Sequence, residues 1–185
     1  MTMKRKWLIG TAVAVVGVLA WAIPAIGTTS GKGGGPVVQV KVVRGDTAAT
    51  TTSQAYATLP GATTTVTVPH GQRALILARF SAESNCVDGD PGEFCSVRIR
   101  IGNADGLPAS GTDFAFDSIR DPSNCSNALF GNNCGWASHS MDRSRGPFRP
   151  GTYTVRVQWR VVGATGVPSF RLDDWSLTVE RVKVG

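Results

Sequence analysis

Five long polar side chains occupy alternating positions of two segments that have the pattern of β-strands, and together they could bind an anion. They are Arg98, Arg100, Arg156, Gln158 and Arg160. Alternating residues of a strand point to the same side of a sheet, so the five side chains share one face if the two strands are neighbours. Guanidinium groups bind carboxylates and phosphates through paired hydrogen bonds. The pattern therefore predicts a binding face for an acidic glycan, a cell-wall polymer with teichoic-type phosphates or a protein partner. The alternative is a solvated face whose charge is balanced by acidic residues of adjacent strands.

Three carboxylates lie close together in a short segment and could bind calcium. Asp88, Asp90 and Glu93 fall within the six-residue sequence Asp-Gly-Asp-Pro-Gly-Glu. Calcium takes oxygen ligands at about 2.3–2.6 Å, and carboxylates are the common donors. The segment lacks the spacing of an EF-hand loop. Calcium is the one cofactor that the sequence indicates, and an acidic solvated loop is the alternative.

Residues that could hydrolyse a substrate are poorly placed in the sequence. Cleavage of a glycan needs two carboxylates roughly 5–10 Å apart in a groove, and Glu83 with Asp113 or Asp117 is the pair that could supply them. A serine hydrolase needs a serine beside a histidine, but His139 and Ser140 are consecutive and would point to opposite faces of a strand. We therefore expect a non-catalytic protein, with a small jelly-roll hydrolase acting on glycans as the alternative.

The four cysteines form two pairs of equal spacing. Cys86 and Cys95 are nine positions apart, and so are Cys125 and Cys134. Both intervening segments are rich in turn-forming residues, which favours a disulfide within each pair, although four cysteines allow three connectivities. Cysteines of an exported chain are usually oxidised. A zinc site would need shorter spacings.

The N-terminus has the pattern of an export signal. Three basic residues (4–6) precede the uncharged and largely apolar segment 7–22, and small residues follow it. This order is typical of a secretory signal peptide, which we place at residues 1–27. The apolar segment could instead remain as a membrane anchor. In both cases the rest of the chain is exported, so we expect a secreted protein, or a cell-surface protein if the segment is not cleaved.

The charge balance argues against a nucleic-acid partner. The full chain carries a net charge of +6, with 19 basic and 13 acidic residues. Three of the basic residues belong to the export signal, so 16 remain against 13 acidic ones and the net charge falls to +3. Domains that bind nucleic acid carry a stronger and clustered excess of positive charge. We also expect membrane contact only through the N-terminal segment, and the sequence leaves the oligomeric state open.

After a Gly- and Ser-rich linker at residues 28–36, residues 37–185 have the pattern of one all-β domain. About eight or nine short segments with period-two alternation are separated by turns, and no amphipathic helix of useful length occurs. This pattern is typical of an antiparallel β-sandwich. A jelly roll is the first choice of topology, and an immunoglobulin-like topology is the second.

Individual strands can be placed from the alternation. We expect separate strands over residues 54–59 and 63–68, ended by the turns Pro60-Gly61 and Pro69-Gly71. Residues 74–82 are apolar at both odd and even positions, so this strand should be covered on both faces. Residues 96–101 should pair with this preceding strand across the tip that the first cysteine pair closes.

The C-terminal part predicts two further strands. Residues 143–151 should form a basic turn, and residues 153–161 and 170–179 should form a hairpin, because both alternate and a turn-rich segment joins them. The apolar positions change parity at Asp173-Asp174, which is the pattern of a one-residue β-bulge.

The chain resembles a group of uncharacterised exported bacterial β-sandwich proteins. The segments that carry the resemblance are 80–86, 95–99, 110–118, 138–143 and 170–177. The resemblance covers residues 54–182 and implies a small β-sandwich outside the cell, with no activity or site attached. The closing strands, with their Trp and Leu residues, are also similar to jelly rolls of the C1q and tumour-necrosis-factor type.

These observations predict a secreted or surface-exposed β-sandwich that acts as a binding or interaction module. A trimeric structural surface protein is a further alternative, because Leu75 and Leu77 have the opposite parity to the core positions of their strand.

Overall fold

Two antiparallel sheets packed face to face make up the described part of the chain. The computed structural model describes residues 35–90, 92–110, 114–119, 135–163 and 168–184, all within the compact unit formed by residues 32–185. The predicted signal (1–27) and most of the linker lie outside these residues. Every regular element described is a β-strand, and these residues contain no helix long and apolar enough to cross a membrane.

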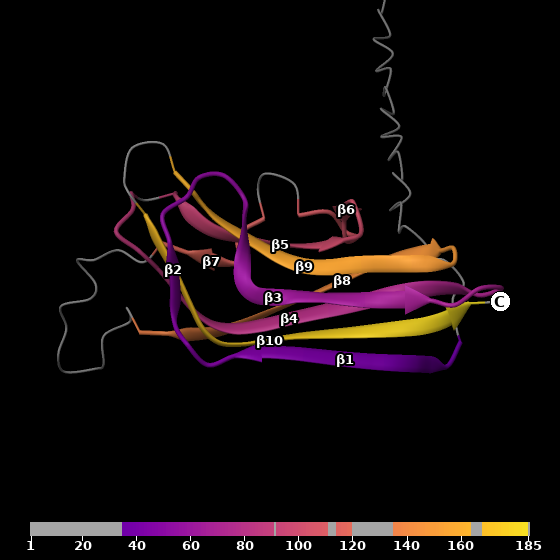
Figure 1. Cartoon of the computed structure of the whole chain (residues 1–185). Helices are drawn as coiled ribbons and strands as arrows, with labels where there is room; N and C mark the ends of the chain where they lie inside the picture. Colours follow the sequence, from indigo (N-terminus) through magenta and orange to yellow (C-terminus); the bar gives the residue numbers. More distant parts are fainter. Residues whose placement is uncertain (1–34, 91, 111–113, 120–134, 164–167, 185) are drawn as a thin grey trace, which may run out of the picture. The chain divides into compact units, whose positions relative to one another are not determined.

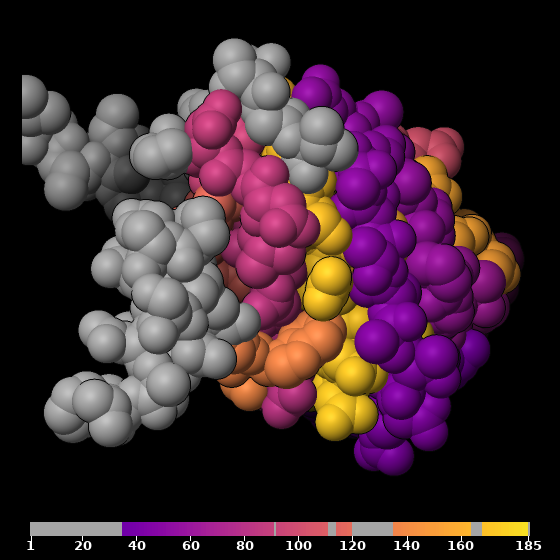
Figure 2. All heavy atoms as spheres, turned by 90° about the vertical axis from the view of Figure 1, so that its left-hand side faces the viewer, coloured from indigo at the N-terminus to yellow at the C-terminus, as the bar shows by residue number. Residues whose placement is uncertain are grey.

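The strands divide equally between the two sheets. Sheet A contains β1 (Val37–Gly45), β2 (Ala49–Thr51), β4 (Arg73–Val87), β8 (Ala137–Phe148) and β10 (Ser169–Val184). Sheet B contains β3 (Ala57–Val68), β5 (Phe94–Ile101), β6 (Ala104–Asp105), β7 (Asp117–Ser118) and β9 (Gly151–Val162). The order is β1-β10-β4-β8 in sheet A and β3-β9-β5-β6 in sheet B, with β2 beside β10 and β7 beside β5. Figure 1 shows the two layers, and Figure 2 shows β10 between β4 and the N-terminal strands.

Alternation builds the core between the sheets. In β9 the odd-numbered residues from Val155 to Val161 are buried, and in β4 the even-numbered residues from Ala74 to Ala82 are buried. Aromatic rings fill the middle of the core, where the ring of Phe170 lies 5.6 Å from that of Trp159 and 6.3 Å from that of Phe116. The fold class predicted from the sequence, an all-β antiparallel sandwich, is therefore confirmed.

The predicted C-terminal hairpin is wrong. β9 pairs with β3 and β5, whereas β10 pairs with β1, β2 and β4, so the two strands lie in opposite sheets. Both segments do have one buried face, as the alternation predicts. A buried face can be covered by the opposite sheet, however, and does not show which strand is the hydrogen-bonded neighbour.

The pairing predicted for residues 96–101 is also wrong, although the disulfide beside them is confirmed. β5 pairs with β9, β6 and β7 and lies in the sheet opposite β4. Cys86 of β4 and Cys95 of β5 are bonded, with Cα atoms 5.9 Å apart, and both residues are fully buried. The disulfide therefore joins the two sheets and does not close a hairpin tip. The second predicted pair, Cys125 and Cys134, lies outside the described residues.

Residues 54–59 and 63–68 do not form two strands, because β3 continues through Pro60-Gly61. A shift in register between Thr58 and Thr63 accommodates the extra residues. Gly61 has a φ of +77°, and a Cβ there would lie 3.3 Å from the ring of Trp175. The indole ring thus occupies the space that this glycine leaves, so the turn-forming pair bends the strand without ending it.

Two other strand expectations need correction. β4 is covered fully on one face only, since Leu75 and Leu77 are half-buried and Arg79 is exposed on the other. The basic turn expected at residues 143–151 belongs largely to β8, which continues to Phe148. Pro147 has no backbone N–H to donate. It is compatible with β8 because β8 is an edge strand, which has no neighbouring strand on its outer side to accept such a hydrogen bond.

The predicted bulge at Asp173-Asp174 is confirmed. The register of β10 against β4 shifts between Asp173 and Ser176, and Asp174 has a φ of +43°. Phe170 and Leu172 before the shift and Trp175 and Leu177 after it all point into the core. The extra residue restores the inward direction of the second half of the strand.

Candidate anion-binding face

The five residues predicted to bind an anion do lie on one face. β5 and β9 are neighbours, and the register places Arg98 opposite Gln158 and Arg100 opposite Arg156. Arg160 lies opposite Ser96, one pair further along the same face. All five predicted side chains are half-buried and on the outer side of sheet B, because the residues between them point into the core. We call Arg98, Arg100, Arg156, Gln158 and Arg160 the arginine face.

Two arginines of this face are directly opposite each other. Arg100 and Arg156 are register partners on adjacent antiparallel strands, where like charges destabilise a sheet. Within the described residues, Arg156 has neither a hydrogen bond nor an ion pair from its side chain. The fold therefore brings two positive charges together and leaves one of them unpaired.

One carboxylate, Asp105 of β6, lies close to both Arg98 and Arg100. Its Oδ1 accepts a hydrogen bond from Arg100 Nη1 at 3.1 Å and lies 3.8 Å from Arg98 Nη1. Arg98 Nε also donates to Gln158 Oε1 at 2.8 Å. Burial lowers the pKa of Arg98, and Asp105 opposes this shift, but a guanidinium stays protonated at neutral pH. One carboxylate is therefore shared by two arginines, and Arg156 adds a positive charge that no described residue pairs.

Tyr56 lies against two arginines of the same face. The guanidinium carbon of Arg98 is 4.0 Å from the centre of the tyrosine ring, and that of Arg160 is 4.6 Å from it. The Tyr56 hydroxyl is hydrogen-bonded to Ser96 Oγ at 2.8 Å, which holds the ring in place. These cation–π contacts orient the two guanidinium groups without neutralising them.

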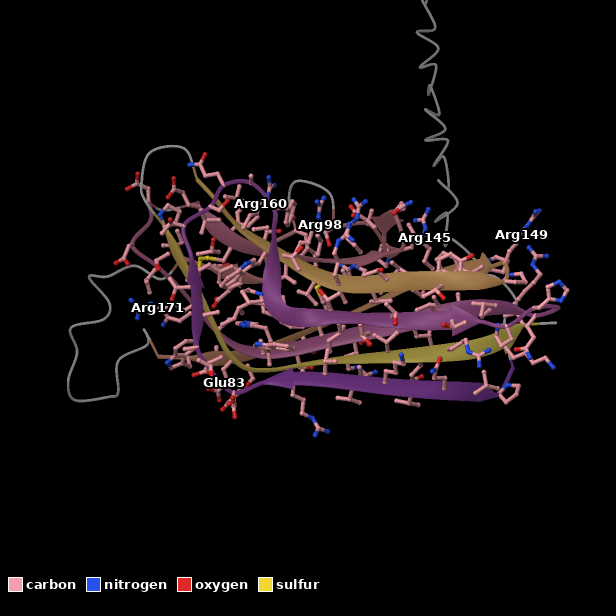
Figure 3. All side chains as sticks on the ribbon, in the orientation of Figure 1. Glu83, Arg98, Arg145, Arg149, Arg160 and Arg171 are labelled. Carbon is pink, nitrogen blue, oxygen red and sulfur yellow. A yellow bond between two sulfur atoms is a disulfide. The ribbon has the colours of Figure 1, made fainter. Side chains whose placement is uncertain are left out.

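The opposite face of the sandwich carries both signs of charge. On the outer side of sheet A, the exposed Arg79 forms an ion pair with Asp142, with 2.8 Å between Nε and Oδ1. Glu83 and Asp173 are register partners on this side, and Arg171 is exposed nearby. Figure 3 shows Arg160, Arg98 and Arg145 along the side formed by sheet B and Glu83 on the other side. Excess positive charge is therefore a property of one face.

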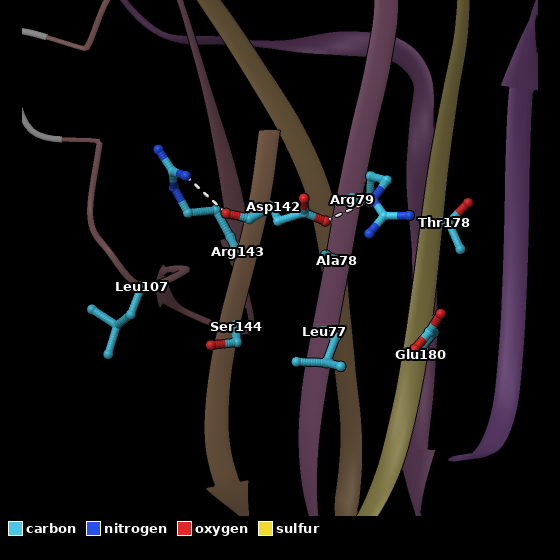
Figure 4. Close-up of a pocket in the computed structure, with 9 residues that line it drawn as sticks. All are labelled: Leu77, Ala78, Arg79, Leu107, Asp142, Arg143, Ser144, Thr178 and Glu180. Atoms are coloured by element: carbon cyan, nitrogen blue, oxygen red, sulfur yellow. Dashed lines mark hydrogen bonds and ion pairs between the residues drawn. The ribbon is translucent and has the colours of Figure 1, made fainter. Parts of the chain in front are cut away.

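A shallow groove of about 290 Å³ lies on the sheet A side (Figure 4). The Arg79–Asp142 ion pair crosses it, and Leu77 and Leu107 provide apolar sides. Arg143 donates a hydrogen bond to the Asp142 carbonyl at 2.8 Å, and burial lowers the pKa of this arginine, an effect that Asp142 opposes. Two arginines, Arg79 and Arg143, and two acids, Asp142 and Glu180, line this groove. Their charges balance, which makes the groove a weaker candidate for a charged ligand.

The residues predicted to bind calcium form a turn at one end of β5. The Glu93 carboxylate accepts a hydrogen bond from the Asp90 amide at 2.9 Å, and Asp88 has a φ of +65°. Within the described residues, no three His, Cys, Asp or Glu side chains are grouped as metal ligands. Calcium binding by Asp88, Asp90 and Glu93 stays a prediction.

The carboxylates considered for hydrolysis are not brought together. Glu83 points outward from sheet A, whereas Asp117 is buried and accepts a hydrogen bond from Ser84 Oγ at 2.7 Å. Glu83 and Ser84 are consecutive strand residues, so the two acids lie on opposite sides of sheet A. Asp113 lies outside the described residues.

A Ser–His–Asp cluster that the sequence does not reveal is present on the inner side of sheet A, where Ser84 and Asp117 are buried and His139 is half-buried. Ser84 Oγ is 2.8 Å from His139 Nδ1 and donates its one proton to Asp117, so His139 must donate through Nδ1. A serine nucleophile needs the reverse arrangement, in which the histidine accepts the serine proton. Because Ser84 is also fully buried, the cluster has a structural role.

Three residues near the arginine face could not have been found from the sequence pattern. Tyr56, Asp105 and Arg145 come from the segment before β3, from β6 and from β8. Arg145 Nη1 donates to the Asp105 carbonyl at 2.7 Å, which places it beside β6. Each is far in sequence from β5 and β9 or lies in a segment with turn-like composition, so only the tertiary contacts identify it.

Comparison with known proteins adds little to this geometry. No family model matches the chain, and no curated protein matches it. Among solved structures, the dimeric latent PorU of Porphyromonas gingivalis is similar with a TM-score of 0.36 and 12% identity. The similarity covers 81% of this chain but only 14% of PorU. We draw no functional conclusion from so weak a likeness.

Proposed function

We propose that this protein is a non-catalytic binding module of the cell exterior, and that its arginine face binds an anionic polymer. The observation that carries the proposal is the in-register pair Arg100 and Arg156. An anionic group placed between them relieves their repulsion and accepts hydrogen bonds from both guanidinium groups. The balanced charges of the sheet A face offer no comparable position.

The ligand class follows from the shape and charge of the face. The arginines are spread along two strands on an open surface, which fits a chain of repeated negative charges better than a single small ion. Acidic glycans and phosphate-containing cell-wall polymers have this chemistry. A protein partner with an acidic surface could make the same hydrogen bonds. We prefer the polymer because the face is a row of cations with few apolar residues, whereas protein–protein interfaces have an apolar centre.

Several features support an extracellular location. The Cys86–Cys95 disulfide is compatible with an oxidising compartment, and the N-terminal sequence has the order of a secretory signal peptide.

The strand order supports a jelly-roll topology. In sheet A the first long strand, β1, lies beside the last, β10, and in sheet B the next pair inward along the chain, β3 and β9, are neighbours. This nested order supports the jelly roll that we infer, in agreement with the resemblance to exported bacterial β-sandwich proteins.

The proposal is tested by binding of the exported domain to polygalacturonate and to inorganic polyphosphate, measured by calorimetry at two salt concentrations. The double variant Arg156→Ala/Arg160→Ala should lower the affinity at least about tenfold, because each lost charged hydrogen bond costs about 1.5–3 kcal/mol. Affinity should also fall with added salt.

The matched control is Arg44→Ala/Arg171→Ala, which removes the same charge from exposed positions of sheet A. It should change the affinity by less than about threefold. Equal losses in both double variants would show that binding depends only on net charge and not on the arginine face. If the native domain binds neither polymer, the proposed function is refuted.

A further inference from the structure

A groove of about 450 Å³ lies beside the arginine face, where β5 ends. The lining residues are Ile101, Gly102, Asn103, Ala104, Arg145, Phe148, Thr152, Tyr153, Thr154 and Arg156. The register of β5 and β9 ends with Ile101 opposite Val155, and one more hydrogen bond joins the Gly102 amide to the Thr154 carbonyl. Within the described residues, the first part of β9 has no strand partner on this side, and its backbone polar groups border the groove.

The groove is positively charged. Arg145 and Arg156 are both among its lining residues, and none of those residues is an acid. Arg145 donates to a backbone carbonyl, that of Asp105, which does not cancel its charge. Arg156 faces Arg100 across the strand pair. Two guanidinium groups of this kind, together with the hydroxyl of Thr154, provide donors for a carboxylate or a phosphate.

The same groove has an aromatic wall. The rings of Phe148 and Tyr153 are 4.3 Å apart between centroids, and the Tyr153 hydroxyl donates to the Arg149 carbonyl at 2.9 Å, which fixes the ring. Gly102 has a φ of +64°, and a Cβ at this position would lie 3.5 Å from the Tyr153 ring and 3.9 Å from the Phe148 ring. The glycine therefore leaves ring atoms accessible from the groove. Figure 3 shows Arg145 beside β6 and Arg149 at the neighbouring end of the strands.

We propose that this groove is a subsite for one acidic sugar unit, with its anionic group at Arg145 and Arg156 and its ring against Phe148 and Tyr153. The inference rests on the proposed function, because the unit belongs to the polymer that the arginine face binds. It adds that the ligand is recognised as a sugar and not only as a chain of charges. A pocket with an apolar wall and a few directed polar groups is the usual form of such recognition.

Three probes separate charge from ring: an oligomer of galacturonic acid, a neutral malto-oligomer and inorganic polyphosphate. Calorimetry should show that the acidic oligomer binds at least about tenfold more tightly than the neutral one, as expected for two charged hydrogen bonds. A fourth probe, a sugar phosphate oligomer in which phosphate replaces the carboxylate, distinguishes the two possible anionic groups by its relative affinity. Binding of either charged oligomer through the groove supports the inference.

Two variants test the groove, and a third is the control for the aromatic substitution. Arg145→Ala should lower the affinity for the acidic oligomer and for polyphosphate. Phe148→Leu should lower only the affinity for the acidic oligomer, by about threefold or more, because it removes the ring while retaining an apolar side chain. Phe114→Leu, which changes an aromatic residue beside Arg143 on another part of the molecule, should leave both affinities unchanged, and melting temperatures verify the fold of each variant.

The possible results differ for the two proposals. If both charged probes bind but Phe148→Leu affects neither, or affects both equally, the sugar subsite is refuted and the proposed function remains. If neither charged probe binds the native protein, both are refuted.

Discussion

Ser84 illustrates how one buried polar residue can hold two sheets together. It belongs to β4 in sheet A, and its hydroxyl bonds both Asp117 of β7 in sheet B and His139 of β8. Asp117 is itself buried, so its carboxylate depends on such donors. A buried charged group that loses a hydrogen-bond partner retains its full cost of desolvation.

We therefore expect Ser84→Ala to lower the free energy of unfolding by about 2–3 kcal/mol, the usual cost when a buried charged group loses a donor. Urea denaturation followed by tryptophan fluorescence measures the change. Ser140→Ala removes the same hydroxyl from an exposed position of β8 and should cost less than about 0.5 kcal/mol. A Ser84→Ala variant as stable as the Ser140→Ala variant would contradict the structural role of the cluster.

Among the strands, β10 depends most clearly on a local irregularity. It is the longest strand in the described part of the chain and pairs with β1, β2 and β4. Its bulge allows two apolar segments, one with even-numbered and one with odd-numbered inward residues, to face one core. Asp174 carries the positive φ, and its amide donates to Asp173 Oδ1 at 2.9 Å. Aspartate tolerates this backbone conformation better than most residues, whereas a β-branched side chain does not.

Asp174→Val should consequently destabilise the protein by about 1–2 kcal/mol, while Asp174→Gly should leave the stability unchanged or slightly raised. Both effects can be measured by thermal and chemical unfolding. Thr178→Val, at a regular position on the outer side of the same strand, is the matched control and should be nearly neutral. If valine is tolerated equally at residues 174 and 178, the bulge is not under the constraint described here.

At the scale of the whole molecule, the free energy of local opening should be highest in the central strands and lower in the edge strands. β4 and β10 lie inside sheet A, and β9 and β5 lie inside sheet B, with the Cys86–Cys95 disulfide joining the two sheets. Among the described strands β1 pairs only with β10, and four of its valines are exposed. Strands that are paired on both sides and buried open only when the domain unfolds.

Native-state hydrogen exchange should therefore find the slowest amides in β4, β9 and β10, with opening free energies close to that of global unfolding. The amides of β1 that point away from β10 should exchange much faster. Uniform slow exchange throughout β1 would show that another chain or segment pairs with this edge, contrary to the expectation.

The inner and outer faces of the strands could be read from the sequence because they depend on a local rule. Period-two alternation predicted that Trp175 and Leu177 point inward after the bulge, and it predicted the common face of Arg98, Arg100, Arg156, Gln158 and Arg160 on condition that their strands are neighbours. The Cys86–Cys95 pair followed from the spacing of the two cysteines and from the turn-forming residues between them. Each of these inferences needs only residues that are close in sequence, or one assumption about pairing.

Only the tertiary structure decided which strands pair and what completes the arginine face. Alternation shows that β9 and β10 each have a buried side, but the same pattern results whether two strands are hydrogen-bonded neighbours or face each other across a core. Asp105, Tyr56 and Arg145 reach the face from other segments, and the in-register repulsion of Arg100 and Arg156 exists only once β5 and β9 are adjacent. The sequence therefore predicts which side chains share the charged face. The unpaired charge and the groove arise only when strands that are distant along the chain pack together.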